Sequence, residues 1–114
     1  MLRPVERVRR RTDYQQIYEH GVRVRGKYST LIVLSNRLQI GRLGIAASKK
    51  LGGAVARNRA KRLIREVFRR NKIAPGFDVV VVPNRDLFGA SLSALEADYR
   101  QHVERTLRRC RQRE

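Results

Sequence analysis

The sequence predicts a single-domain α+β sandwich whose elements follow the order αβββαβα. At 114 residues, with 41% hydrophobic residues, the chain is long enough for one modest core and too short for two domains. Two segments have the apolar period of amphipathic helices, and the short segments around them have the alternating or β-rich pattern of strands. Helices and strands of this kind bury their apolar faces by packing against each other.

A basic arm is predicted at residues 1–11. Five arginines and one acidic residue occur between positions 3 and 11, without an apolar period. Such a segment is expected to be extended and to become ordered only against a partner. A short helix follows, which Thr12 or Asp13 is expected to cap and which is expected to end before Gly21.

Two tyrosines lie one turn apart on this first helix, at Tyr14 and Tyr18. They could be core residues, which is the commoner role of such a pair. They could instead form a platform on which unpaired bases stack, each stacked base contributing about 1–3 kcal/mol. The residues alone leave both alternatives open.

Four strands are predicted along the chain. Residues 22–25 alternate, and residues 28–34 are rich in β-branched and apolar side chains. Residues 35–39 are expected to form a hairpin connection to a third strand at 43–48. The fourth strand is predicted at 77–82, where an apolar run indicates a buried strand.

The predicted third strand has one shallow face. Its larger side chains alternate with Gly44, Ala46 and Ser48. Small residues on one face of a strand leave room for a ligand to lie across it. We therefore expect this face to be open.

A strongly basic helix is predicted from Ala54 to about Asn71. Between Lys49 and Arg70 the chain has nine basic residues and one acidic residue, a net charge of +8. Apolar residues lie on one helical face, and polar residues gather on the opposite face: Asn58, Lys61, Arg62, Arg65 and Arg69. Like charges one turn apart repel by a few tenths of a kcal/mol. A polyanionic partner that neutralises this face therefore explains it best.

The last predicted helix begins with a capping box formed by Ser93 and Glu96. Its apolar face contains five residues at helical spacing: Leu95, Tyr99, Val103, Leu107 and Cys110. Its arginines lie elsewhere, and we interpret them as a solvated face.

The charge of the whole chain indicates a nucleic-acid partner. The formal net charge is +17, with an isoelectric point near 11.6. The longest apolar runs have four residues, too few to span a membrane, and the N-terminus lacks the hydrophobic core of a signal peptide. A cytoplasmic protein without membrane attachment is expected. The only cysteine and the two isolated histidines predict neither a metal site nor a catalytic constellation.

The segment from Ser48 to Asn71 contains Ser48-Lys49-Lys50, a glycine pair and the triplet Arg57-Asn58-Arg59, followed by further basic residues. In residue types and spacing it resembles the signature helix of the bacterial ribonuclease P protein subunit. More than twenty consecutive positions agree in residue type. The resemblance implies a four-stranded sheet with a left-handed βαβ crossover through this helix, against the usual right-handed preference.

The same resemblance implies a function and partners. It implies an RNA-binding subunit of an endoribonuclease that removes the 5′ leader from precursor tRNA, in a 1:1 ribonucleoprotein with a catalytic RNA. The catalytic centre and its Mg²⁺ ions are expected in that RNA, and no cofactor is expected on the protein. Seven residues are expected to contact the catalytic RNA: Arg57, Asn58, Arg59, Lys61, Arg62, Arg65 and Arg69. Five are expected to bind the leader: Tyr14, Tyr18, Ser48, Lys49 and Lys50.

Three other functions fit the residues less well. A general RNA-binding module would use the same basic helix without any dependence on a leader. A helix in a DNA major groove would need a second short helix beside it, whereas strands flank this one. A nuclease that acts without RNA would need clustered carboxylates or histidines.

Overall fold

The computed structural model describes residues 4–112 and contains three helices and four strands in the predicted order. The helices are α1 (Arg11–His20), α2 (Ala54–Arg70) and α3 (Leu92–Gln112). The strands are β1 (Val22–Arg25), β2 (Ser29–Ser35), β3 (Arg42–Ile45) and β4 (Phe77–Pro83). Three short 3-10 turns lie at η1 (Pro4–Glu6), η2 (Lys49–Leu51) and η3 (Arg85–Gly89). The predicted α+β fold is confirmed.

The four strands form one sheet in the order β1-β2-β4-β3. The pairs β1–β2 and β2–β4 are antiparallel, whereas β3 and β4 are parallel. The predicted hairpin at residues 35–39 is therefore wrong, because β4 lies between β2 and β3. β4 is buried along most of its length, as its apolar run indicated.

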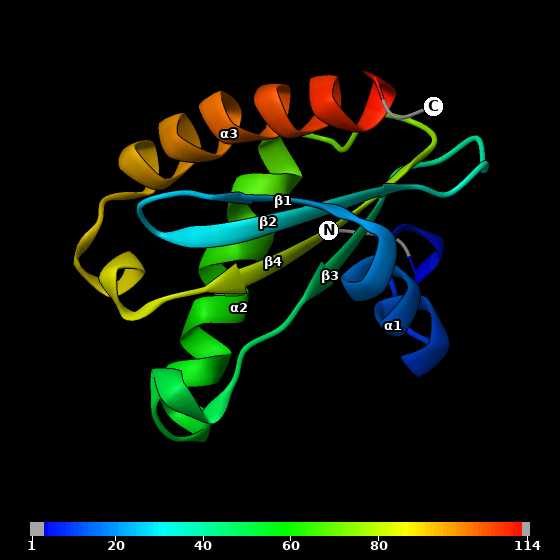
Figure 1. Cartoon of the computed structure of the whole chain (residues 1–114). Coiled ribbons are helices and arrows are strands. Elements are labelled where there is room, and N and C mark those ends of the chain that lie inside the picture. The colour runs from blue at the N-terminus through cyan, green and yellow to red at the C-terminus, as the bar shows by residue number, and fades with distance from the viewer. Residues whose placement is uncertain (1–3, 113–114) are drawn as a thin grey trace.

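The parallel pair is joined by a crossover through α2. In Figure 1, β3 and β4 both run leftward. From the end of β3 the chain passes behind the sheet, returns through α2 and enters β4, which lies above β3 in this view. This path makes the crossover left-handed, as the sequence resemblance implied. It places the basic helix behind the sheet, where its apolar face packs on side chains of β2 and β4.

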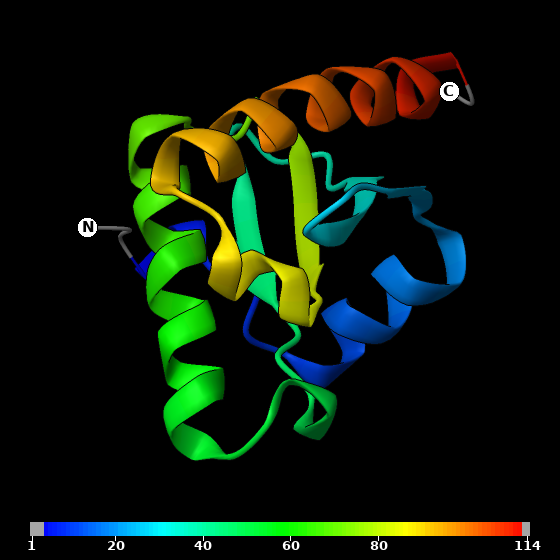
Figure 2. The same ribbon diagram turned by 90° about the vertical axis from the view of Figure 1, so that its left-hand side faces the viewer.

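The sheet separates two apolar clusters. On one face α2 and α3 cover a cluster that includes Leu31, Val33, Val79 and Phe68. On the other face α1 covers a smaller cluster of Val8, Ile17, Ile32 and Val80. Figure 2 shows α2 and α1 on opposite sides of the sheet, with α3 across one end.

The N-terminal segment packs on the sheet edge, which corrects the prediction of an arm that becomes ordered only against a partner. Arg7 forms a parallel bridge with Leu43 of β3, and the Val8 amide donates to the Leu43 carbonyl at 2.8 Å. Val8 is 5% exposed and packs against Ile17. This one apolar side chain explains the docking. Residues 1–3 of the predicted arm lie outside the described residues.

The predicted cap of α1 is also wrong, although the helix ends before Gly21 as expected. The residue before the helix is Arg10, which makes no side-chain capping hydrogen bond. Asp13 lies in the first turn, and its carboxylate pairs with Arg42 at 3.6 Å. An ion pair to β3 thus takes the acid that was expected to cap the helix.

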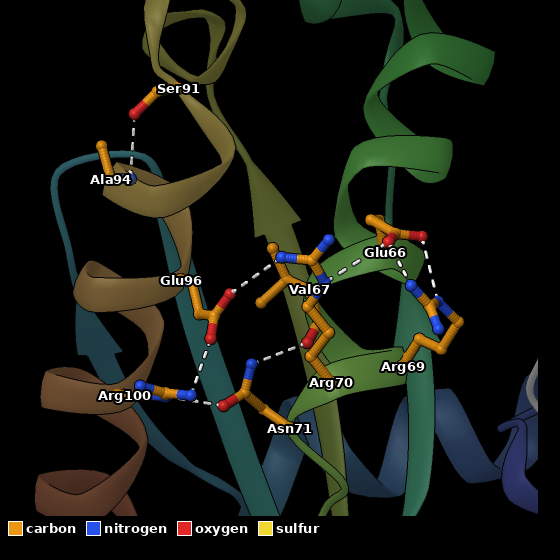
Figure 3. Close-up of polar contacts among 9 residues, drawn as sticks. All are labelled: Glu66, Val67, Arg69, Arg70, Asn71, Ser91, Ala94, Glu96 and Arg100. Atoms are coloured by element: carbon orange, nitrogen blue, oxygen red, sulfur yellow. Dashed lines mark hydrogen bonds and ion pairs between the residues drawn. The ribbon is translucent and has the colours of Figure 1, made fainter.

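The start of α3 differs from the prediction by two residues. Ser91 rather than Ser93 caps the helix, because the Ser91 hydroxyl accepts a hydrogen bond from the Ala94 amide at 3.1 Å. Glu96 does not close a capping box and instead pairs with Arg100 at 2.7 Å and Arg70 at 3.9 Å (Figure 3). These contacts join the end of α2 to the start of α3.

The apolar face of α3 follows the predicted spacing, with one addition. Leu95, Tyr99 and Cys110 are buried, and Val103 and Leu107 pack at the edge of the cluster. Thr106 is fully buried on the same face, where its hydroxyl donates to the His102 carbonyl at 2.6 Å. This hydrogen bond satisfies the Thr106 hydroxyl inside the core. The apolar period alone did not place this polar residue on the buried face.

A buried ion pair joins β3 to β4. The Asp78 carboxylate is 4% exposed and accepts two hydrogen bonds from Arg42, at 2.7 and 2.6 Å. It also accepts one from the Asn36 side chain at 2.8 Å. The hydrogen bond to Asp78 raises the pKa of the Arg42 guanidinium above its ordinary value. Both carboxylate oxygens are therefore satisfied in an otherwise apolar strand.

Candidate RNA interface

The basic residues of α2 form a continuous outward stripe. Asn58, Arg62 and Arg65 are exposed, and Lys61 is half-buried beside them. With Arg69 and with Arg7 from the N-terminal segment, they line a hollow of about 480 Å³. We call this surface the basic stripe: Asn58, Lys61, Arg62, Arg65 and Arg69. Its cationic groups are placed to contact the phosphates of a nucleic acid.

The charge of the basic stripe is partly neutralised at its C-terminal end. Glu66 accepts hydrogen bonds from Arg69 at 2.6 and 3.2 Å and lies 3.5 Å from Arg70 (Figure 3). The Arg69 hydrogen bond lowers the pKa of the Glu66 carboxyl below its ordinary value. The strongest uncompensated charge of the stripe therefore lies at Lys61, Arg62 and Arg65.

The two arginines of the Arg57-Asn58-Arg59 triplet point to opposite flanks of α2. Residues two positions apart differ by about 200° around a helix, so the pair straddles Asn58. Arg57 is half-buried, and its Nε is buried without a hydrogen-bond partner among the described residues. Arg59 is exposed and lies over the ring of Phe88, 5.6 Å from its centroid. The triplet thus combines an inward-turned cation with an outward one.

The segment before α2 forms a tight turn rather than the end of the predicted third strand. Strand β3 ends at Ile45, and the Ser48 hydroxyl accepts a hydrogen bond from the Lys50 amide at 3.3 Å. Gly52 has φ 128°, a conformation that favours glycine. Ser48, Lys49 and Lys50 are all exposed in this turn. They lie between β3 and α2, as expected, but not on a strand face.

The two tyrosines of α1 have different environments. Their ring centroids are 6.2 Å apart at an interplanar angle of 39°. Tyr14 packs over the edge strand, where a Cβ added at Gly44 would lie 2.8 Å from the Tyr14 hydroxyl oxygen. Burial raises the pKa of this hydroxyl, although a hydrogen bond with the Ile45 backbone opposes the shift. Tyr18 is 36% exposed. Tyr14 is thus partly a core residue, whereas Tyr18 is exposed.

The shallow face of β3 is filled where it meets α1. Tyr14 occupies the space above Gly44, and Ala46 packs at the edge of the smaller apolar cluster. The prediction of an open face is therefore wrong at Gly44. The Tyr14 side chain, which was expected to bind the leader, packs on the strand there.

Arg23 was not among the predicted site residues and lies beside Tyr18. Its guanidinium carbon is 5.9 Å from the Tyr18 ring centroid, and its Nη2 donates to the Tyr18 carbonyl at 3.0 Å. The alternation of Val22, Arg23, Val24 and Arg25 was a detectable signal, because it places both arginines on the face opposite the buried valines. Arg23 supplies a cation next to the exposed aromatic ring.

The basic stripe and the tyrosine pair meet around the edge of β3. A hollow of about 180 Å³ is lined by Tyr14 from α1 and by Lys61 and Arg65 from α2. The helices α1 and α2 cover opposite faces of the sheet. Because β3 is a short strand at the edge of the sheet, side chains from both helices reach past it into the same hollow. One polynucleotide surface can therefore continue from the stripe to the aromatic rings.

Within residues 4–112, no group of three or more His, Cys, Asp or Glu side chains is placed to hold a metal ion. His102 lies against Asp98 on its own helix, with Nδ1 3.3 Å from the carboxylate. In the part of the chain that the structure describes, no helix is both long and apolar enough to cross a membrane.

Comparisons with known proteins agree on one family. Residues 2–107 match the Ribonuclease P family. The Ribonuclease P protein component of Syntrophus aciditrophicus is 48% identical over 83 residues, which span 71% of this chain and 70% of that protein. Its counterpart from Clostridioides difficile is 36% identical over 98 residues, which span 83% of this chain and 86% of that protein.

A solved structure shows the same fold. The RNase P protein from Thermotoga maritima superposes with a TM-score of 0.79 and 35% identity, and the match covers 88% of this chain and 96% of that chain. Proteins of this family are components of a ribonucleoprotein endoribonuclease of tRNA processing. The family match and both relatives lead to the same assignment: this chain belongs to the ribonuclease P protein family.

Proposed function

We propose that this protein is the RNA-binding subunit that assists a catalytic RNA in the endonucleolytic removal of the 5′ leader from precursor tRNA. The observation that best supports this function is the hollow where Tyr14 meets Lys61 and Arg65. It joins a surface suited to phosphates with a surface suited to unpaired bases, so one protein can hold two RNA segments side by side.

The basic stripe binds the catalytic RNA in this proposal. Phosphate and sugar contacts suit it, because its residues present cations and an amide along the solvent-facing side of one helix. The residues assigned to this contact are those expected from the sequence: Arg57, Asn58, Arg59, Lys61, Arg62, Arg65 and Arg69. Arg69 contributes less than the others, because Glu66 already neutralises it.

The leader lies across the sheet face beside α1 in this proposal. Tyr18 offers an exposed ring on which an unpaired base can stack, and Tyr14 supports it from below. Lys49 and Lys50 lie in the turn that follows β3, where they are placed for the leader phosphates, and Ser48 orders that turn. Arg23 adds a cation beside Tyr18.

The chemistry of cleavage belongs to the RNA partner in this proposal. Mg²⁺ ions held by the catalytic RNA supply the activated water and stabilise the charge that develops on the phosphate. The side chains of this protein bind, position and neutralise charge in a 1:1 complex in the cytoplasm. The charge of +17 serves that task directly, because it lowers the repulsion between two RNA molecules.

Tyr18→Ala is expected to weaken binding of precursor tRNA to the assembled complex by about 1–3 kcal/mol, the usual contribution of one base stack. Binding of mature tRNA is expected to stay unchanged, because mature tRNA has no leader to stack on the ring. Fluorescence titration of the two RNAs against the complex measures both affinities.

Tyr18→Phe is the matched control, because it keeps the ring and removes only the hydroxyl. Its affinity for precursor tRNA is expected to equal that of the wild type. Equal losses on precursor and mature tRNA with Tyr18→Ala would show that the tyrosine supports the fold rather than the leader.

A further inference from the structure

A second hollow lies beside the first turn of α2, outside the basic stripe. It has a volume of about 540 Å³, and its lining includes Leu51, Val55, Arg59, Arg85 and Phe88, which we call the Phe88 surface. A Cβ added at the neighbouring Gly53 would contact nothing within 4 Å, so the hollow is open to solvent there. This volume falls in the range of sites that hold small ligands.

An arginine already lies over the aromatic ring of this surface. The Arg59 guanidinium carbon lies 5.6 Å from the Phe88 ring centroid, although the two residues come from different elements, α2 and η3. Figure 2 shows η3 beside α2. A guanidinium is planar, so a guanidinium beside a ring can also stack with a further flat group. Unpaired nucleic-acid bases are such groups, and proteins stack them on both aromatic rings and guanidinium planes.

The same surface exposes a large apolar side chain. Val55 is 85% exposed, the highest value among the exposed large hydrophobic residues within the described part of the chain. It projects from the first turn of α2, next to the hollow. Because Val55 lines the hollow, its side chain is placed to contact a ligand that occupies it.

The charge of the hollow favours RNA as the partner. Two arginines, Arg59 and Arg85, line it, and no acidic side chain of residues 4–112 does. In a chain with a net charge of +17, a second copy of the protein would bring further positive charge to this surface. A nucleotide satisfies every feature of the surface, because its base stacks and its phosphate pairs with an arginine.

We propose that the Phe88 surface binds one unpaired nucleotide of the catalytic RNA. The catalytic RNA is the source because Arg59 shares α2 with the basic stripe, whereas the tyrosines assigned to the leader lie beyond the other face of the sheet. This inference rests on the proposed function. It adds a base contact to an interface that otherwise consists of contacts to phosphates and sugars.

The test uses Phe88→Leu in the full-length protein and a bacterial ribonuclease P RNA as the probe. The variant is expected to bind this RNA about tenfold more weakly, within the range for loss of one base stack. The salt dependence of binding is expected to stay that of the wild type, because no charge is removed. Base-specific chemical probing is expected to show one unpaired nucleotide that wild-type protein protects and Phe88→Leu leaves reactive.

Val55→Ser tests the same surface without altering the packing of Phe88. Its matched control is Val5→Ser, because Val5 is also an exposed valine, at 57%. Val55→Ser is expected to weaken RNA binding about threefold, by loss of apolar contact, and Val5→Ser is expected to bind like the wild type. Thermal unfolding of each variant establishes that it is folded. If Phe88→Leu does not fold, the RNA affinity of Val55→Ser alone decides whether the Phe88 surface binds RNA.

Four results would overturn the inference. The first is wild-type affinity and footprint in Phe88→Leu and Val55→Ser. The second is a loss confined to leader-bearing precursor, which would assign the surface to the leader. The third is a wild-type dimer that Phe88→Leu dissociates in sedimentation, which would assign it to a second copy of the chain. The fourth is a wild-type protein that does not bind the RNA at all, and only this result would also remove the proposed function.

Discussion

Asp78→Ala is expected to destabilise the fold by about 3 kcal/mol, because it leaves the half-buried charge of Arg42 with only the longer ion pair to Asp13. The substitution also removes the acceptor of the Asn36 side chain, which ties the loop after β2 to β4. Equilibrium unfolding in urea measures the change as a shift of the midpoint.

Two further variants define the cause of this effect. Glu66→Ala breaks an exposed ion pair and is expected to unfold near the wild-type midpoint, because solvent screens such pairs. Arg42→Met combined with Asp78→Leu is expected to recover most of the stability, because it leaves no buried charge unpaired. A wild-type midpoint for Asp78→Ala would show that the ion pair does not hold β3 to β4.

Replacement of Lys61, Arg62 and Arg65 together by alanine is expected to weaken binding to the catalytic RNA roughly a hundredfold or more. These three residues carry the strongest uncompensated charge of the basic stripe. Each lost phosphate contact also lowers the dependence of log affinity on log salt by about one unit, so the slope is expected to fall by about three. Filter binding across a salt series measures both quantities.

The matched control removes the same charge from α3. Arg105, Arg108 and Arg109 are all exposed there, on the helix whose arginines we interpret as a solvated face. Their replacement by alanine is expected to change the affinity far less and to leave most of the salt slope. Equal losses from both triple variants would mean that the RNA responds to total charge and not to the basic stripe.

Local pattern was sufficient to predict most of the elements. The apolar period of α2 located its start and end, because a long amphipathic helix repeats its signal over several turns. The two serines at the start of α3 show the limit of such signals. Ser91 and Ser93 are equally good capping residues by type, and only the path of the chain after η3 decides between them.

Contacts between distant segments were beyond the sequence pattern. Asp78 interrupts an apolar strand, and nothing near it in the sequence indicates that Arg42 and Asn36 satisfy its carboxylate. The position of β4 between β2 and β3 likewise depends on pairing across the whole chain. Val8 docks the N-terminal segment through a single apolar side chain, which is too little signal for a periodic analysis.

The sequence predicts on which helix each candidate residue lies, but not how the two helices meet. The basic stripe and the tyrosine pair follow from helical spacing alone, because each lies on one helix. Their meeting around the edge of β3 depends on the left-handed crossover. The contact between Arg59 and Phe88 joins residues nearly thirty positions apart, and neither one indicates the other.

Cleavage of a 5′-labelled precursor tRNA at low Mg²⁺ tests the central claim most directly. Three samples are compared: this protein alone, a bacterial ribonuclease P RNA alone, and the two together. The proposed function predicts that only the combination cuts, once, at the junction between leader and tRNA, because the RNA carries the chemistry and the protein lowers the charge repulsion. Cleavage by the protein alone, or an RNA whose cleavage the protein never changes, would contradict it.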